Sequence, residues 1–182
     1  MTGAYRVIAG LVPGIGVWLS WGPKTWMPGT RPGITLTGWS MVTNADMVGV
    51  YRQTGEEMVD ASGKLIHSDN NRSSQIMYSA DGYVGVVSTP AGRKKTSAPA
   101  GRTDLGGATA EELADATRSV TCYAGHYDVK DGEVHHHVEM ALNPNLIGQT
   151  MIRRVHFDGP NLTLSARPDA QGQVRRILWR RV

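Results

Sequence analysis

The residues best suited to chemistry gather around one two-residue turn, Asp131-Gly132. Strand-like runs precede and follow this turn, and an Asp-Gly pair between such runs predicts a β-hairpin. A two-residue turn pairs Lys130 with Glu133. The same register predicts four further opposed pairs: Asp128 with His135, Tyr127 with His136, His126 with His137, and Ala124 with Glu139.

Alternation along the two strands sorts their side chains onto two faces of the hairpin. The polar face carries His126, Asp128, His135, His137 and Glu139. The other face carries Tyr123, Tyr127, Val129, Val134, His136, Val138, Met140 and Leu142. Since a half-buried antiparallel sheet turns its polar side to water, we expect the second face to line the interior.

The interior face has the make-up of a ligand pocket, with apolar walls and few polar groups. His136 titrates near neutrality and can move a proton, and Tyr127 lies across the ladder within hydrogen-bonding reach. We therefore predict His136 and Tyr127 as catalytic residues. A structural His–Tyr hydrogen bond in the core is the alternative interpretation.

The run 151–158 also alternates, and its apolar face includes Arg153. A guanidinium that points inward needs a carboxylate or an anionic ligand group as its partner. The alternative is an arginine at the barrel end that reaches water. The predicted substrate-binding residues are Tyr123, Arg153, Val138, Met140 and Tyr78.

The polar face admits a metal hypothesis, because imidazole and carboxylate ligands suit zinc or iron. The residues concerned are His126, His135, His137 and Glu139. A solvated outer face explains the same residues, and we expect neither a metal nor another cofactor.

Turn signals at short intervals separate the strand-like runs of the chain. These runs are 48–54, 74–79, 83–88, 122–130, 133–142, 151–158, 162–167 and 174–182, with a short hairpin at 57–67 and an N-terminal strand at 34–42. A meander of about eight strands tends to close, and such a barrel can hold one small ligand. The predicted fold is therefore all-β: an antiparallel meander closed into a roughly eight-stranded barrel.

One helix interrupts the strands. Thr109 and Glu112 form a capping-box pattern, and Leu113, Ala116 and Val120 supply a short apolar stripe. The preceding stretch, 89–108, is rich in Pro, Gly and Ser and is expected to be a loop.

Composition narrows the function classes. The chain has 182 residues, a net charge of +3, 40% hydrophobic and 19% charged residues, which is typical of a globular protein. Its two basic clusters, 93–102 and 175–181, largely lack stacking aromatics, so we expect no nucleic-acid partner. The single cysteine, Cys122, cannot form an internal disulfide and is expected to be buried; a cytoplasmic location fits.

Residues 1–46 are predicted to be an N-terminal extension and residues 47–182 the barrel domain. The apolar run 7–19 is shorter than the roughly 20 residues that span a bilayer. A lid on the barrel is the favoured interpretation. A peripheral membrane contact and a sequence upstream of the true start are the alternatives.

Several segments together resemble the bacterial and fungal lipocalin-like domain proteins. They are Met47–Arg52, Tyr78–Tyr83, Tyr123–Val129, His136–Glu139, Arg153–Val155 and Leu178–Arg180. The resemblance implies a calycin-type barrel of a kind found among natural-product pathway enzymes, some of them cyclases or isomerases. Lipocalins usually carry Gly-x-Trp on the first strand, whereas this chain has Gly49-Val50-Tyr51; Tyr51 is expected to stack under Arg180 or Arg181.

The predicted function is a cofactor-independent isomerase or cyclase that acts on an apolar intermediate of a polyketide or terpenoid type of pathway. A non-catalytic carrier for a small apolar ligand is the alternative. The expected partner is that small molecule, and a homodimer remains an open possibility.

Overall fold

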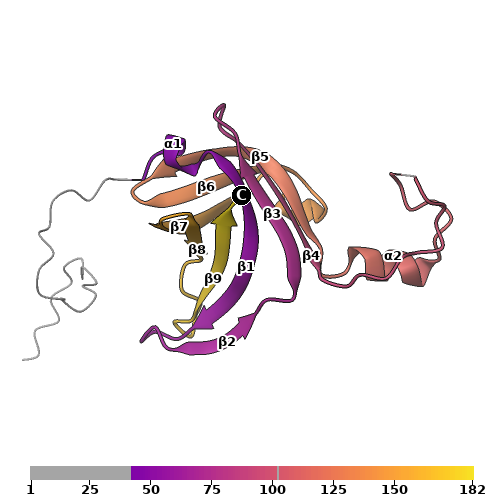
Figure 1. The fold of residues 1–182 in the computed structure, drawn as a ribbon, viewed down its shortest axis with the longest axis horizontal. Helices are drawn as coiled ribbons and strands as arrows, with labels where there is room; N and C mark the ends of the chain where they lie inside the picture. Colours follow the sequence, from indigo (N-terminus) through magenta and orange to yellow (C-terminus); the bar gives the residue numbers. More distant parts are fainter. Residues whose placement is uncertain (1–41, 102) are drawn as a thin grey trace, which may run out of the picture. The chain divides into compact units, whose positions relative to one another are not determined.

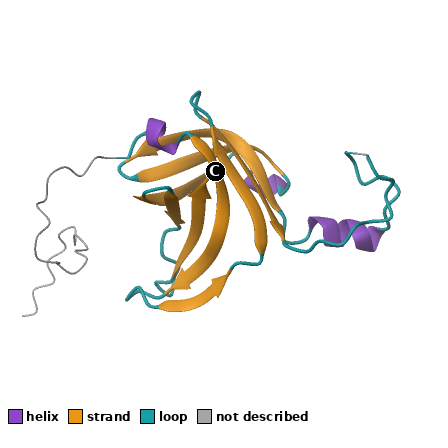
Figure 2. Cartoon of the chain, in the orientation of Figure 1, coloured by secondary structure: helices purple, strands orange, loops and turns teal. Residues whose placement is uncertain are grey.

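The computed structural model describes residues 42–101 and 103–182 (Figures 1 and 2). The N-terminal strand predicted at 34–42 and the interpretations of residues 7–19 lie outside this part, except for Val42, which is not in a strand. None of the described helices is long and apolar enough to cross a membrane.

In the described part of the chain, nine antiparallel strands form one sheet, in the order β2-β1-β3-β4-β5-β6-β7-β8-β9. They are β1 (Gly49–Val59), β2 (Leu65–Asp69), β3 (Arg72–Tyr78), β4 (Tyr83–Pro90), β5 (Thr121–Lys130), β6 (Glu133–Ala141), β7 (Thr150–Asp158), β8 (Asn161–Ser165) and β9 (Val174–Arg181). Pairing of β1 with β9 closes eight of them into a barrel, and β2 adds a hairpin to the end of β1. The predicted all-β, roughly eight-stranded barrel is confirmed.

The seam between the first and last strands is fixed by side chains as well as by the backbone ladder. The guanidinium of Arg181 lies 5.0 Å from the ring centroid of Tyr51 and donates a 2.6 Å hydrogen bond to its hydroxyl. Arg181 also donates to the carbonyls of Val48 and Asp46. The predicted stacking of Tyr51 is thus confirmed, with Arg181 as the partner.

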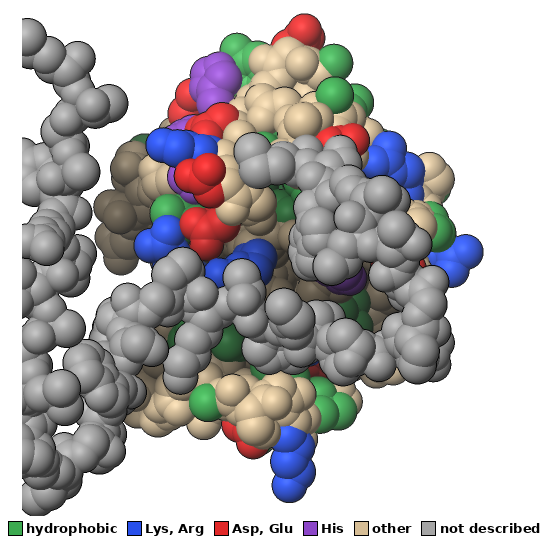
Figure 3. Space-filling view, turned by 90° about the vertical axis from the view of Figure 1, so that its left-hand side faces the viewer, with side chains coloured by type: hydrophobic (Ala, Val, Ile, Leu, Met, Phe, Trp, Pro, Cys, Tyr) green, Lys and Arg blue, Asp and Glu red, His purple; other side chains and the backbone are tan. Residues whose placement is uncertain are grey.

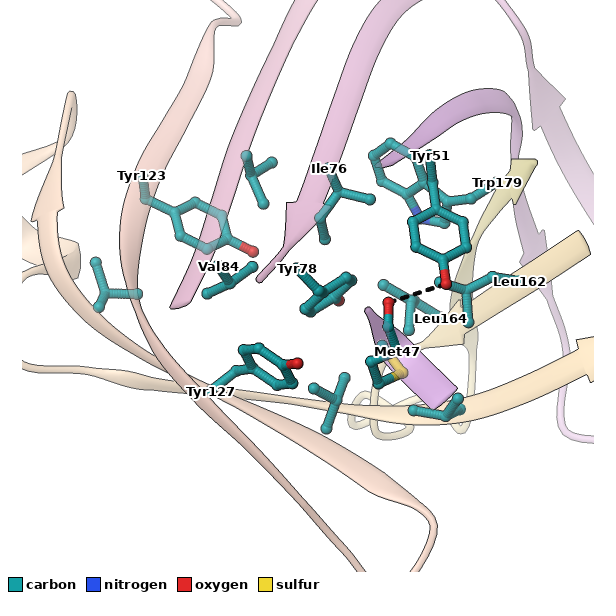
Figure 4. Close-up of a cluster of buried hydrophobic side chains, with 14 residues drawn as sticks. Met47, Tyr51, Ile76, Tyr78, Val84, Tyr123, Tyr127, Leu162, Leu164 and Trp179 are labelled. Atoms are coloured by element: carbon teal, nitrogen blue, oxygen red, sulfur yellow. Dashed lines mark hydrogen bonds between the residues drawn. The ribbon is translucent and has the colours of Figure 1, made fainter. Parts of the chain in front are cut away.

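The short helix α1 (Asn44–Met47) plugs the end of the barrel where β1 begins. Met47 is fully buried, and its carbonyl accepts a 2.9 Å hydrogen bond from the hydroxyl of Tyr51 (Figure 4). Tyr127 donates to the carbonyl of Asn44 at 3.2 Å. The figure shows Met47 among the aromatic and aliphatic side chains of the core, so this end of the barrel is filled.

A β-bulge interrupts the pairing of β5 with β6 between Ala124 and Gly125. The register predicted from the turn is confirmed from Lys130 back to Gly125, but Ala124 pairs with Met140 and not with Glu139. A Cβ atom on Gly125 would lie 1.9 Å from the carbonyl oxygen of His137, so this close approach requires glycine.

Beyond the bulge, the side chains that follow Glu139 face the side of the sheet opposite to the predicted one. Met140 is 61% exposed and Leu142 is 44% exposed, while Ala141 packs against the core. The interior position predicted for Met140 and Leu142 is therefore wrong, because one extra residue in a strand turns every later side chain to the opposite face.

The helix α2 (Ala110–Thr117) begins as predicted at the Thr109–Glu112 capping box. It buries no residue and ends before Val120. Between β4 and α2, the described residues 91–101 and 103–109 are rich in turns and contain no helix or strand. The 3₁₀ helix η1 (Pro144–Leu146) follows β6. Cys122 is exposed, so its predicted burial is wrong.

Candidate functional site

A cavity of about 360 Å³ occupies the barrel half opposite α1. Its open rim is formed by the first residues of β3, β5, β7 and β9 and the last residues of β4. Strands β1, β6 and β8, η1 and residues 119–120 supply the rest of its wall. Its apolar wall comprises Ile76, Val86, Val120, Tyr123, Leu146, Met151, Leu164, Ile177 and Trp179. Its polar wall comprises Gln53, Glu56, Arg72, Ser88, Ser119, Thr121, His136, Arg153 and Arg175.

His136 lies between two tyrosines at the inner end of this cavity. It is 1% exposed; its Nε2 lies 2.9 Å from the hydroxyl of Tyr78 and its Nδ1 lies 2.8 Å from the hydroxyl of Tyr123. The three side chains come from β3, β6 and β5, so the barrel closure brings them together. Both ring nitrogens of a deeply buried imidazole are therefore satisfied.

Burial fixes the protonation of this chain of three groups. Desolvation, followed by the positive charge of Arg153, lowers the pKa of His136 from 6.5 to about 3. Burial raises the pKa of Tyr123 to about 12 and also raises the pKa of Tyr78 well above its usual value. Near neutral pH the imidazole is uncharged and both phenols keep their protons, so His136 donates to one tyrosine and accepts from the other.

Tyr127 is not the hydrogen-bonding partner of His136, and that prediction is wrong. Its backbone lies opposite His136, as predicted, but its hydroxyl donates to the carbonyls of Ser79 and Asn44. Its ring packs edge-on against Tyr78, with centroids 4.9 Å apart. Tyr127 therefore holds α1 against the barrel.

The inward orientation predicted for Arg153 is confirmed, since Arg153 lines the cavity. Its guanidinium donates a 2.7 Å hydrogen bond to the carbonyl of Ile152, and no carboxylate of the described residues lies within ion-pair distance. Burial lowers the pKa of this guanidinium from its usual value. Val138 is buried in the core and is not part of the cavity wall.

Three charged residues of the cavity were not predicted as site residues. Arg175 forms a two-pronged ion pair with Glu56, at 2.6 and 2.7 Å. Arg72 donates to the hydroxyl of Ser88 and, at the rim, to the carbonyl of Ser119. With Arg153, three arginines thus face one glutamate, and the cavity is more polar and more basic than the sequence pattern indicated.

The polar face of the β5–β6 hairpin lies outside the barrel, as predicted. His126 pairs with Glu139, and Asp128 contacts His137 at 2.5 Å and His135 at 3.8 Å. Among residues 42–101 and 103–182, no group of three or more His, Cys, Asp or Glu side chains is placed to hold a metal ion. Figure 3 shows histidine, acidic and basic side chains intermixed on the face it views.

A second hollow, of about 410 Å³, lies between the segment 90–96 and α2. None of its wall residues is buried, and it contains no deeply buried polar group. The barrel cavity, which combines apolar walls with His136, Tyr123 and Arg153, is therefore the candidate site.

Comparison with known proteins agrees with this geometry. A search of curated proteins found none that matches the chain. The family model described as a lipocalin-like domain matches residues 48–182, which include all eight barrel strands. A barrel of this family is consistent with the binding of a small molecule in its interior. The chain therefore belongs to the lipocalin-like domain family.

Proposed function

We propose that the protein binds a small molecule in the barrel cavity and catalyses its isomerisation or cyclisation without a cofactor. The observation that carries this proposal is the Tyr78–His136–Tyr123 chain, which ends at the cavity wall on the hydroxyl of Tyr123. A tyrosine hydroxyl held in this way is a preorganised hydrogen-bond donor for an oxygen atom that gains negative charge.

The roles differ from those predicted by sequence. With a pKa of about 3, His136 is not a protonated acid at neutral pH, so its part is to hold Tyr123 in position. Tyr123 takes the place of Tyr127 as the donor to a substrate carbonyl. The walls add confinement, which favours ring closure by selecting a reactive conformer.

The test is native mass spectrometry of the full-length protein after incubation with extracts of cells that produce it. Isomerisation and cyclisation conserve mass, so we expect a released molecule of unchanged mass and altered chromatographic retention. Tyr123→Phe is expected to retain the molecule without converting it. Tyr83→Phe, at an exposed tyrosine, is the matched control and should convert it normally.

A non-catalytic carrier is the second candidate, favoured by the low pKa of His136, which makes its imidazole a weak base. A retained molecule that is released chemically unchanged by both the original protein and Tyr123→Phe would establish the carrier and reject the enzyme.

The setting of this activity is proposed from the family resemblance alone. Barrels of this kind among natural-product enzymes suggest a polyketide or terpenoid type of intermediate. The cytoplasmic location is likewise a proposal, based on the single cysteine.

A further inference from the structure

Of the three arginines in the cavity wall, Arg153 forms no hydrogen bond or ion pair with another side chain of the described residues. Arg175 is paired with Glu56, and Arg72 donates to Ser88 and Ser119. Arg153 donates only to the carbonyl of its neighbour Ile152, and no carboxylate of residues 42–101 and 103–182 pairs with it. A partly buried guanidinium of this kind favours an anionic partner.

Tyr123 can supply a further donor to the same cavity. A neutral imidazole carries one N–H group. One of the two tyrosines bonded to His136 therefore accepts a hydrogen bond from this N–H, and its own hydroxyl hydrogen remains available for another acceptor. Tyr123 lines the cavity and Tyr78 does not, so a hydrogen left on Tyr123 can reach a ligand.

We infer that the cavity selects ligands that carry one carboxylate on an apolar body, with Arg153 and the hydroxyl of Tyr123 as its donors. This inference rests on the proposed binding of a small molecule in the barrel and names the class of that molecule. Ile76, Val86 and Leu164 provide the apolar wall for the rest of the ligand.

The test compares three probes of equal chain length: decanoate, 1-decanol and decylammonium. Their binding to the full-length protein is measured by isothermal titration calorimetry at pH 7.5, with the original protein and two variants. Arg153→Met removes the cation. Arg154→Met is the matched control, because Arg154 is the exposed neighbour on the same strand. Far-UV circular dichroism verifies the fold of each variant.

We expect decanoate to bind at least tenfold more tightly than 1-decanol, and decylammonium to bind most weakly. Arg153→Met should weaken decanoate binding roughly tenfold to a hundredfold, with the affinity for 1-decanol unchanged. Arg154→Met should have no effect.

Two results would overturn the inference in different ways. Equal affinity for decanoate and 1-decanol, unchanged in Arg153→Met, would refute carboxylate selection and leave binding in the barrel intact. Failure of the folded protein to bind any of the three probes would refute the proposed binding function together with the inference.

Discussion

The guanidinium of Arg181 on the last strand lies over the ring of Tyr51 on the first strand, 5.0 Å from its centroid, and donates to its hydroxyl. Tyr51 in turn donates to the carbonyl of Met47 in α1. The barrel seam and the plug at its closed end are thus joined through one pair of side chains. Closure at this end leaves the opposite half of the barrel for the cavity.

Loss of this pair should weaken the closed barrel. We expect Arg181→Met to lower the free energy of unfolding by about 1 to 2 kcal/mol, because it removes the cation–π contact and charged hydrogen bonds at a site open to solvent. Urea unfolding followed by circular dichroism measures the change. Arg180→Met, at the exposed neighbour, is the control and should change stability by less than about 0.5 kcal/mol. Equal effects of the two variants would contradict the role of the pair.

The bulge at Gly125 should not tolerate a side chain. A Cβ atom there would lie 1.9 Å from the carbonyl oxygen of His137, so Gly125→Ala must displace backbone. We expect a loss of about 2 to 4 kcal/mol, or failure to fold. Gly85→Ala is the matched control, because its Cβ would meet only the flexible end of Met77 at 3.7 Å. Similar unfolding midpoints for both variants would show that the bulge is not required.

The buried His136 should make the protein sensitive to acid. Burial lowers its pKa from 6.5 to about 3, so between these values the unfolded chain binds more protons than the folded one. Stability from this residue is present above pH 6.5 and is lost as the pH falls toward 3. Between pH 7 and pH 4.5 the loss should be about 2 to 3 kcal/mol.

His136→Gln removes this titration and keeps groups that can donate to and accept from Tyr78 and Tyr123. Urea unfolding at both pH values measures how much free energy of unfolding each protein loses between pH 7 and pH 4.5. This loss should be smaller in the variant by about 2 to 3 kcal/mol, since the other titrating groups are common to both proteins. Identical losses would mean that His136 is not buried in its neutral form.

The hairpin shows what the sequence could and could not predict. Asp131-Gly132 has a strong turn preference, and the backbone ladder keeps the register of that turn as far as the pair Gly125–Val138. Gly125 itself was a visible signal for the bulge that follows, because glycine inside a strand often marks one. The alternation rule alone placed Met140 inside, and the bulge places it outside.

The candidate site was only partly predictable for a different reason. Register relates side chains on adjacent strands, and it correctly placed His136, Tyr123 and Arg153 on inward faces. The contact of Tyr78 with His136 joins β3 to β6, and the pairing of Glu56 with Arg175 crosses the seam between β1 and β9. Both depend on how the barrel closes, which local patterns do not determine.

The central claim is that the barrel cavity holds a small molecule, and native mass spectrometry of the full-length protein incubated with producing-cell extract tests it most directly. Two variants accompany the original protein: Met151→Trp, which fills the cavity, and Met140→Trp, which adds the same ring on the exposed outer surface. The account predicts one retained small molecule per chain in the original protein and in Met140→Trp, and none in Met151→Trp. Retention by folded Met151→Trp, or no retention by any of the three, would contradict it.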